Sequence, residues 1–267
     1  MRATIWGCRG SLSTPGGQTV RYGGNTTSVE VRPSSGRLVI LDAGTGIRSL
    51  GTSLTGPPTS VDLLLTHLHL DHVEGLGFFW PLFAQGCPIT ITGPHQDGTS
   101  LAERIATWLS PPFFPRRFDE LTADITVVER GEETWSLDGL TITSRRVQHP
   151  GDTLAYRLEE NGRALAFIPD NELGLAPESG LELAQNADVL FHDAQYTSEE
   201  YATRVGWGHT SLDQLPAYLE AARPGRMVMF HHDPSHADDA LEGMRDVAEQ
   251  LCGRELELAA EGAVYEV

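Results

Sequence analysis

Short apolar strands that end close to a histidine or an aspartate are the feature that most constrains how this chain can fold. Four candidate strands have this form: Arg37–Leu41 before Asp42, Val61–Leu65 before His67-Leu68-His69-Leu70-Asp71-His72, Ala164–Ile168 before Asp170, and Met227–Phe230 before His231. Strand ends of a layered α/β fold are where binding sites converge. We therefore expect these polar residues to meet at one site.

The other elements predict two sheets packed face to face with helices outside them. Apolar or alternating runs predict further strands at Ala3–Trp6, Thr27–Arg32, Pro88–Thr92, Thr122–Arg130, Leu140–Val147, Thr153–Glu159 and Val189–Phe191. Helices are predicted at Ser100–Leu109, Leu181–Ala187, Leu212–Ala222 and Asp238–Leu251. A length of 267 residues suits one α/β domain over residues 1–267.

Composition narrows the classes of partner. The formal net charge of −18 lacks the basic footprint of a nucleic-acid binder, so long nucleic acid is not the expected partner. A bound metal pair can still attract a small phosphate ester locally. The odd set of Cys8, Cys87 and Cys252 predicts reduced thiols in a cytoplasmic protein. The opening MRATIWGCRGS has no signal-peptide core, and no run approaches a membrane span.

The run His67-x-His69-x-Asp71-His72 carries the strongest chemical signal. Imidazole and carboxylate groups suit zinc, and also manganese or iron, while no thiolate is present in the run. In a loop after a strand, these side chains can face two points a few ångströms apart. Two divalent ions need further ligands, and the candidates that follow other strands are His149, Asp170 and either His231 or His232.

These motifs, in this order, resemble those of the metallo-β-lactamase superfamily over essentially the whole chain. The resemblance implies a four-layer αββα sandwich. It also implies one metal ion on His67, His69 and His149, a second on Asp71, His72 and His231, and Asp170 bridging them. Asp42, in the turn LDAGTG, matches an aspartate that supports the metal loop. His231 directly follows its strand as the last ligand does, and His232 would then support the ligands or face the substrate.

The segment Gly206-Trp207-Gly208-His209-Thr210-Ser211 resembles the ribonuclease Z-like phosphodiesterase branch of the superfamily. There the histidine contacts the phosphate or protonates the leaving oxygen, so His209 is a candidate general acid or oxyanion stabiliser. The alternative is a loop histidine that precedes a helix cap at Thr210 or Ser211. His192 or Asp193, in a similar His-Asp-Ala segment, could position His209 from behind.

The glycine-rich opening resembles a bacterial group near the phosphoribosyl cyclic phosphodiesterases. In Gly7-Cys8-Arg9-Gly10-Ser11 and Arg21-Tyr22-Gly23-Gly24-Asn25, Arg9 or Arg21 could pair with a phosphate and Asn25 could contact the substrate. The same loop could merely join two strands. The apolar stretch Trp108–Phe118 could wall the site, or form a contact in a homodimer.

The expected function is hydrolysis of a small or cyclic phosphodiester at two metal ions. Such a pair, about 3.5–4 Å apart, makes hydroxide from water near neutral pH and neutralises the phosphate, and Asp71 could orient the nucleophile. A ribonuclease Z-type RNA endonuclease and a thioester or lactone hydrolase share the ligands. Only 21 positions separate His149 from Asp170, which leaves no room there for the arm of ribonuclease Z. A non-catalytic module is disfavoured because every expected ligand position is intact.

Overall fold

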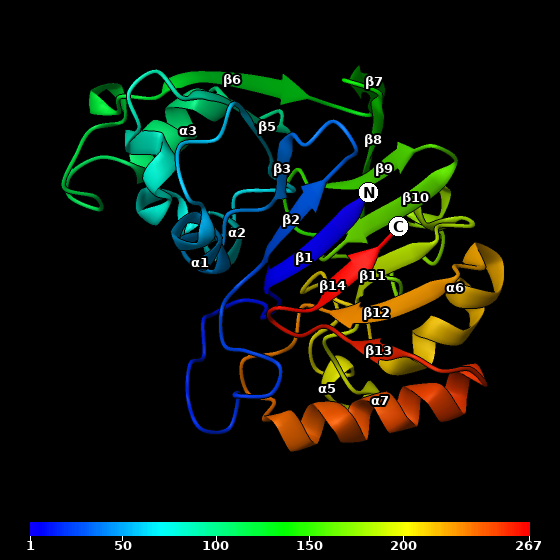
Figure 1. The fold of residues 1–267 in the computed structure, drawn as a ribbon. Helices are drawn as coiled ribbons and strands as arrows, with labels where there is room; N and C mark the ends of the chain where they lie inside the picture. The colour runs from blue at the N-terminus through cyan, green and yellow to red at the C-terminus, as the bar shows by residue number, and fades with distance from the viewer.

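The structure is a computed structural model that describes all residues from Met1 to Val267, and it contains two seven-stranded sheets (Figure 1). The first sheet has the order β14-β1-β2-β3-β4-β5-β6, with β1 Arg2–Gly7, β2 Ser28–Arg32, β3 Leu38–Leu41, β4 Val61–Leu64, β5 Pro88–Pro94, β6 Asp124–Arg130 and β14 Val264–Glu266. The second has the order β13-β12-β11-β10-β9-β8-β7, with β7 Glu133–Leu137, β8 Leu140–Arg146, β9 Leu154–Glu160, β10 Arg163–Ile168, β11 Val189–Asp193, β12 Arg226–Phe230 and β13 Glu257–Leu258.

Helices cover the outer face of each sheet. The helices are α1 Gly46–Ser53, α2 Leu70–Val73, α3 Leu101–Trp108, α4 Leu181–Ala184, α5 Ser198–Tyr201, α6 Leu215–Ala222 and α7 Asp238–Cys252, with 3-10 turns at Leu76–Phe78, Trp80–Phe83, Phe118–Glu120 and Leu212–Gln214. In Figure 1, α1, α2 and α3 lie on one side of the molecule, and α6 and α7 on the other. None of these helices is both long and apolar enough to span a membrane.

Three apolar clusters account for the layers, because neighbouring side chains of a strand point to opposite faces of its sheet. On β10, Leu165 and Phe167 enter the cluster between the sheets, whereas Ala166 and Ile168 pack under the helices of the second sheet. The first sheet alternates in the same way between the central cluster and the cluster beneath α1 and α3. The expected αββα sandwich is therefore confirmed.

Most predicted elements are found within a residue or two of their expected bounds. The helix expected at Leu181–Ala187 ends at Ala184 instead, because Gln185 has an extended backbone (φ −60°, ψ 119°) and Asn186 after it is left-handed with φ +52°. The helix expected at Leu212–Ala222 divides into a 3-10 turn and α6, which begins at Leu215 with Pro216 in its first turn. The sequence prediction missed β7, although Asp138-Gly139 is a hairpin signal and joins β7 to β8 with positive φ at both residues.

The direction of the strands brings the polar residues to one edge. Strands β3, β4, β5 and β6 are parallel, as are β10, β11 and β12, so the carboxyl ends within each group share an edge. Strand β8 is antiparallel to β9, and β9 to β10, so β8 also ends at the edge where β10 ends. The residues that follow β3 and β4 are therefore neighbours, as are those that follow β8, β10 and β12, and contacts such as that of Asp71 with His231 bring the two edges together.

The central cluster gives a prediction for stability. Ile142 on β8 is fully buried between the sheets, so Ile142→Val should lower the free energy of unfolding by about 1 kcal/mol through the lost methylene and the space it leaves. Urea denaturation would measure the change. Val20→Ala is the control, because the Val20 side chain is 75% exposed and its truncation should change stability by less than about 0.5 kcal/mol. Equal effects at both positions would contradict this account of the core.

Candidate metal centre

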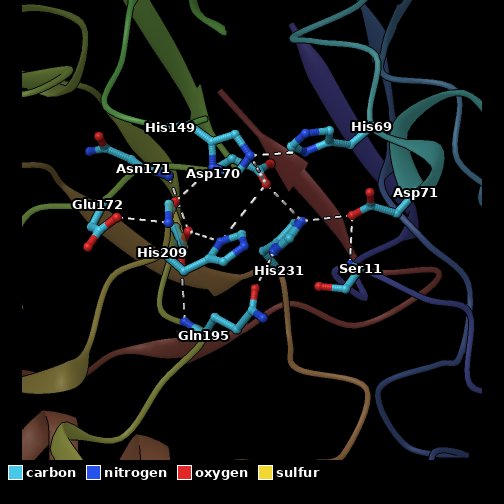
Figure 2. A network of polar contacts seen from close by, with 12 residues as sticks. Ser11, His69, Asp71, His149, Asp170, Asn171, Glu172, Gln195, His209 and His231 are labelled. Atoms are coloured by element: carbon cyan, nitrogen blue, oxygen red, sulfur yellow. Dashed lines mark hydrogen bonds and ion pairs between the residues drawn. The ribbon is translucent and has the colours of Figure 1, made fainter. Parts of the chain in front are cut away.

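The segment His67–His72, which we call the metal loop, follows β4 and ends in α2, whose first turn carries Asp71 and His72. His67, Asp71 and His72 are buried, whereas His69, just before the helix, is exposed. The loop therefore reaches from the interior at His67 to solvent at His69. Figure 2 shows His69 and Asp71 pointing toward side chains that come from the second sheet.

Two groups of three side chains face common points. His67, His69 and His149 form the first group, in which His149 Nε2 lies 3.1 Å from His69 Nδ1. Asp71, His72 and His231 form the second. In this group His231 Nε2 lies 3.1 Å from Asp71 Oδ2 and 3.3 Å from His72 Nε2.

Asp170 lies between these groups and is nearly fully buried. Its Oδ1 is 3.2 Å from His231 Nε2 and 3.8 Å from His149 Nε2, while its Oδ2 is 3.1 Å from His72 Nε2. Asp170 Oδ2 and His67 Nε2 are buried and make no hydrogen bond. Buried polar atoms are rarely left without a partner, so these two atoms point to a ligand. This carboxylate reaches His149 of the first group and His231 and His72 of the second, so it suits a ligand shared by a pair of divalent ions.

Each of four histidines has its Nδ1 atom held from behind, which turns Nε2 toward the centre. The Nδ1 contacts are Asp42 Oδ2 for His72 (2.8 Å), the Gly208 carbonyl for His149 (2.9 Å), Gln195 Oε1 for His231 (2.7 Å) and Thr66 Oγ1 for His67 (3.0 Å). Such contacts fix the orientation of metal-binding histidines and raise their basicity. The arrangement is that of a prepared nitrogen and oxygen donor set.

The electrostatic surroundings favour the protonation states that metal binding needs at His67, His149 and Asp170. At His72 and His231 burial lowers the pKa, but the carboxylates of Asp170 and Asp71 raise it further than burial lowers it, so metal binding must displace protons from these two imidazoles. Burial lowers the pKa of His67 well below its usual value and lowers the pKa of His149 to about 4, so both imidazoles are neutral. Burial by itself would raise the pKa of Asp170, but the imidazoles of His231 and His72 hold this pKa well below its usual range. Neutral imidazole and ionised carboxylate are the forms that bind metal.

Asp42 supports the metal loop, as the resemblance implied. This aspartate is fully buried at the end of β3, in a left-handed conformation with φ +59°. Its Oδ1 accepts a hydrogen bond from the Thr66 backbone N–H at 2.7 Å, and its Oδ2 accepts one from the Thr66 hydroxyl at 2.9 Å. Since Oδ2 also contacts His72, one carboxylate orients both the start of the loop and its last histidine.

His209 lies beside the cluster and is held by Asp193. The His209 Nδ1 atom is 2.8 Å from Asp193 Oδ2, and its ring stacks on that of His231 at 4.9 Å between centroids (Figure 2). Asp193 also accepts hydrogen bonds from the backbone N–H groups of Asn171 and Gln195. The Asp193 contact at Nδ1 leaves His209 Nε2 free of hydrogen bonds within the protein.

His192 does not hold His209, so that alternative is wrong. Its Nδ1 donates to the Asp193 carbonyl at 2.7 Å, and its ring packs against Tyr218 on α6. Alternation along β11 explains the difference, because His192 points to the helix layer and Asp193 to the space between the sheets. The sequence alone does not show which face of β11 each side chain occupies, so it could not distinguish Asp193 from His192 as the residue that positions His209.

Three expected substrate contacts are also wrong, because their side chains are engaged elsewhere. Arg9 is fully buried and donates to the carbonyls of Gly23 (2.8 Å) and His236 (2.6 Å). His232 is buried, and its Nε2 contacts the Ala259 carbonyl at 2.9 Å. Asn25 donates to Glu261 at 2.9 Å. Arg21, the other arginine considered for a phosphate, forms surface ion pairs with Asp239 and Glu242.

The opening loop contributes backbone groups instead. The Ser11 N–H donates to Asp71 Oδ2 at 2.7 Å (Figure 2). Gly10 packs against His231 so closely that a Cβ atom there would lie 2.2 Å from His231 Nδ1. The sequence prediction missed these contacts, as it missed Thr66, Gln195 and the Gly208 carbonyl. Only the glycines gave a signal, since they permit close backbone approach.

Comparison with known proteins agrees with the fold and the site, which define a metal-dependent hydrolase. Residues 37–232 match the family described as beta-lactamase superfamily domain, and the chain belongs to this superfamily, with the metallo-β-lactamase fold. Ribonuclease Z of Limosilactobacillus fermentum is 24% identical over 288 residues, covering 85% of this chain and 89% of that protein.

Solved structures show the same fold at low sequence identity. The metallo-β-lactamase fold protein YhfI from Bacillus subtilis aligns over 99% of both chains with a TM-score of 0.74 and 17% identity. A new diphosphatase from the PhnP family aligns over 100% of this chain and 97% of its own, with a TM-score of 0.71 and 17% identity.

Proposed function

We propose that residues 1–267 form one hydrolase domain that cleaves a small or cyclic phosphodiester with the help of two divalent metal ions. The observation that carries the proposal is His209, an imidazole held by Asp193 at 2.8 Å beside the seven residues expected to bind metal. A site that only bound metal would not need this eighth group. A phosphodiesterase does, because the departing oxygen gains charge and must be protonated or stabilised.

One ion would be held by His67, His69 and His149, and the other by Asp71, His72 and His231, with Asp170 shared. When bound, the ions supply an activated water near neutral pH and neutralise the charge of the phosphodiester. The nitrogen and oxygen donors suit zinc, with manganese and iron as the alternatives to be tested.

Two of the chain's own side chains divide the remaining work. Asp71 keeps one oxygen on the Ser11 N–H at 2.7 Å, which orients the carboxylate to align the attacking water. His209 Nε2 donates a proton to the leaving oxygen, while Asp193 at Nδ1 holds the ring in place for this transfer. Asp71 Oδ2 lies 3.1 Å from His231 Nε2 and the His209 ring stacks on the His231 ring, so both groups border the second group of ligands.

A ribonuclease Z-type RNA endonuclease is the second candidate. It is favoured by the relative named ribonuclease Z, which matches most of this chain. Against it stand the net charge of −18 and the short path from His149 to Asp170, most of which β9, β10 and the turn between them occupy. An RNA substrate therefore belongs in any test of the proposal.

A substrate panel tests the proposal directly. Zinc-, manganese- and iron-loaded protein would be assayed against bis(p-nitrophenyl) phosphate, cyclic nucleotides, a precursor tRNA, a thioester and a lactone. We expect turnover of the small phosphodiesters to exceed that of every other class, and treatment with a chelator to abolish it. Preferred cleavage of the precursor tRNA would favour the ribonuclease, and preferred cleavage of the thioester or lactone would overturn the phosphodiesterase proposal.

A further inference from the structure

Glu172 is a buried carboxylate that has no cationic partner and follows Asp170 by two residues. Its side chain is held by three neutral donors: the Gly206 N–H at 2.7 Å and the Tyr201 hydroxyl at 2.8 Å on Oε1, and the Gly208 N–H at 2.8 Å on Oε2. Burying a carboxylate costs free energy unless hydrogen bonds compensate it. The folded state therefore favours the positions in which these three donors contact Glu172. In Figure 2, Glu172 lies beside Asn171 and His209.

The loop that Glu172 holds carries two parts of the site. Its Gly208 carbonyl accepts the hydrogen bond from His149 Nδ1 at 2.9 Å, and the next residue is His209. Glu172 also reaches the His149 segment directly, because its backbone N–H donates to the Gln148 carbonyl at 2.7 Å. One residue therefore joins the segment before His149 to the loop that bears His209.

The two glycines explain why this loop needs an external support. Gly206 and Gly208 have φ of +87° and +94°, in a region that other residues rarely adopt. A Cβ atom on Gly208 would lie 2.1 Å from His149 Nδ1, so glycine is also required there for close contact. Glycine gives the backbone this conformation but also the most freedom to leave it, and the Glu172 carboxylate restrains both N–H groups.

We propose that Glu172 is a positioning residue that sets His149 and His209 relative to each other through the Gly206–Gly208 loop. Its effect on turnover rests on the proposed function, whereas its effect on the loop and on His149 does not. We call the hydrogen bonds from the Gly206 and Gly208 N–H groups to the Glu172 carboxylate the latch. With the latch intact, the His149 imidazole keeps its Nε2 directed at the first metal group, and His209 stays stacked on His231. With the latch broken, both would shift together.

Glu172→Gln is the informative substitution, because it preserves size but replaces one acceptor oxygen with an NH2 donor. Whichever way the amide turns, one of the two glycine N–H groups loses its acceptor and faces another donor. Glu178→Gln is the matched control, since it makes the same change at an exposed glutamate of the same connection. Tyr201→Phe is a milder variant that removes one donor and leaves both glycine contacts.

The experiment has a readout on the metal-free protein and two on the loaded protein. In metal-free Glu172→Gln, NMR should show faster hydrogen exchange at the Gly206 and Gly208 amides. Chelator competition should show metal affinity about 10–100-fold weaker, and kcat for bis(p-nitrophenyl) phosphate should fall by a similar factor with a smaller change in KM. The Glu178→Gln variant should match the wild type in all three.

A folded Glu172→Gln variant with the hydrogen exchange, metal affinity and kcat of the wild type would overturn the proposal. So would a loss of activity no larger than the fraction of the variant that is unfolded. If that variant does not fold, Tyr201→Phe should still show smaller changes in the same direction, and its identity with the wild type would refute the latch. Absence of phosphodiesterase activity in the wild type, with altered exchange and affinity in the variant, would reject the proposed function and support the latch.

Discussion

Asp170→Ala should leave the protein with less than one tightly bound metal ion and lower metal-dependent hydrolysis at least about 1,000-fold. The reason is the position of this carboxylate, whose Oδ1 lies 3.8 Å from His149 Nε2 of the first group and 3.2 Å from His231 Nε2 of the second. Alanine removes a ligand from both groups and the only carboxylate that faces both of them. Elemental analysis after gel filtration would count the bound metal, and bis(p-nitrophenyl) phosphate hydrolysis would measure activity.

Asp62→Asn provides the control for Asp170. Asp62, on β4 of the first sheet, is likewise a buried aspartate, but its carboxylate pairs with Arg37 at 2.7 Å rather than with the histidines. This variant should bind two metal ions like the wild type. A fully metal-loaded and active Asp170→Ala protein would show that Asp170 does not hold the ions, and the proposed binding scheme would have to be abandoned.

His209→Ala should retain both metal ions yet lower kcat by about 100- to 10,000-fold. The His209 ring lies against His231 and His149 without taking part in the expected ligand set, so its removal affects the leaving oxygen rather than the ions. Asp193→Asn should lower kcat in the same direction, because an amide oxygen accepts the His209 Nδ1–H hydrogen bond more weakly than a carboxylate and holds the ring less firmly. Metal content and steady-state kinetics, measured on the same samples, separate the two effects.

His95→Ala is the control for His209. His95 is exposed and contacts Glu129 at the surface, so its removal should leave kcat and metal content unchanged. A loss of metal from the His209 variant would mean that this histidine is a ligand, which the geometry also permits because His209 lies close to His149 and Asp170. Retention of full activity would remove the observation on which the phosphodiesterase proposal rests.

The layers of the fold and the residues that face the metal centre were predictable from the chain itself. Periodic apolar residues define the strands, and the alternation on β10 and β12 fills one cluster between the sheets and another beneath the helices. The candidate ligands follow strand ends, and parallel strands bring their carboxyl ends to the same edge. His231 was preferred over His232 on this ground, and the structure turns His231 into the cluster.

Contacts between distant segments were decided by the tertiary structure alone. Arg9 looked free to bind a phosphate, but its guanidinium meets backbone carbonyls of Asp233 and His236, more than 200 positions along the chain. Gln195 and Glu172 gave no signal, because their partners are His231 and two glycine N–H groups that only folding brings near.

Local patterning thus determined which side chains leave the strand ends, whereas packing of the two sheets decided what holds those side chains in place. The physical reason lies in the range of the interactions involved. The alternation of apolar residues depends only on residues that are neighbours in the sequence. A hydrogen bond between a carboxylate and a backbone N–H needs atoms to come within about 3 Å, and the sequence carries no mark of which distant backbone group will arrive there.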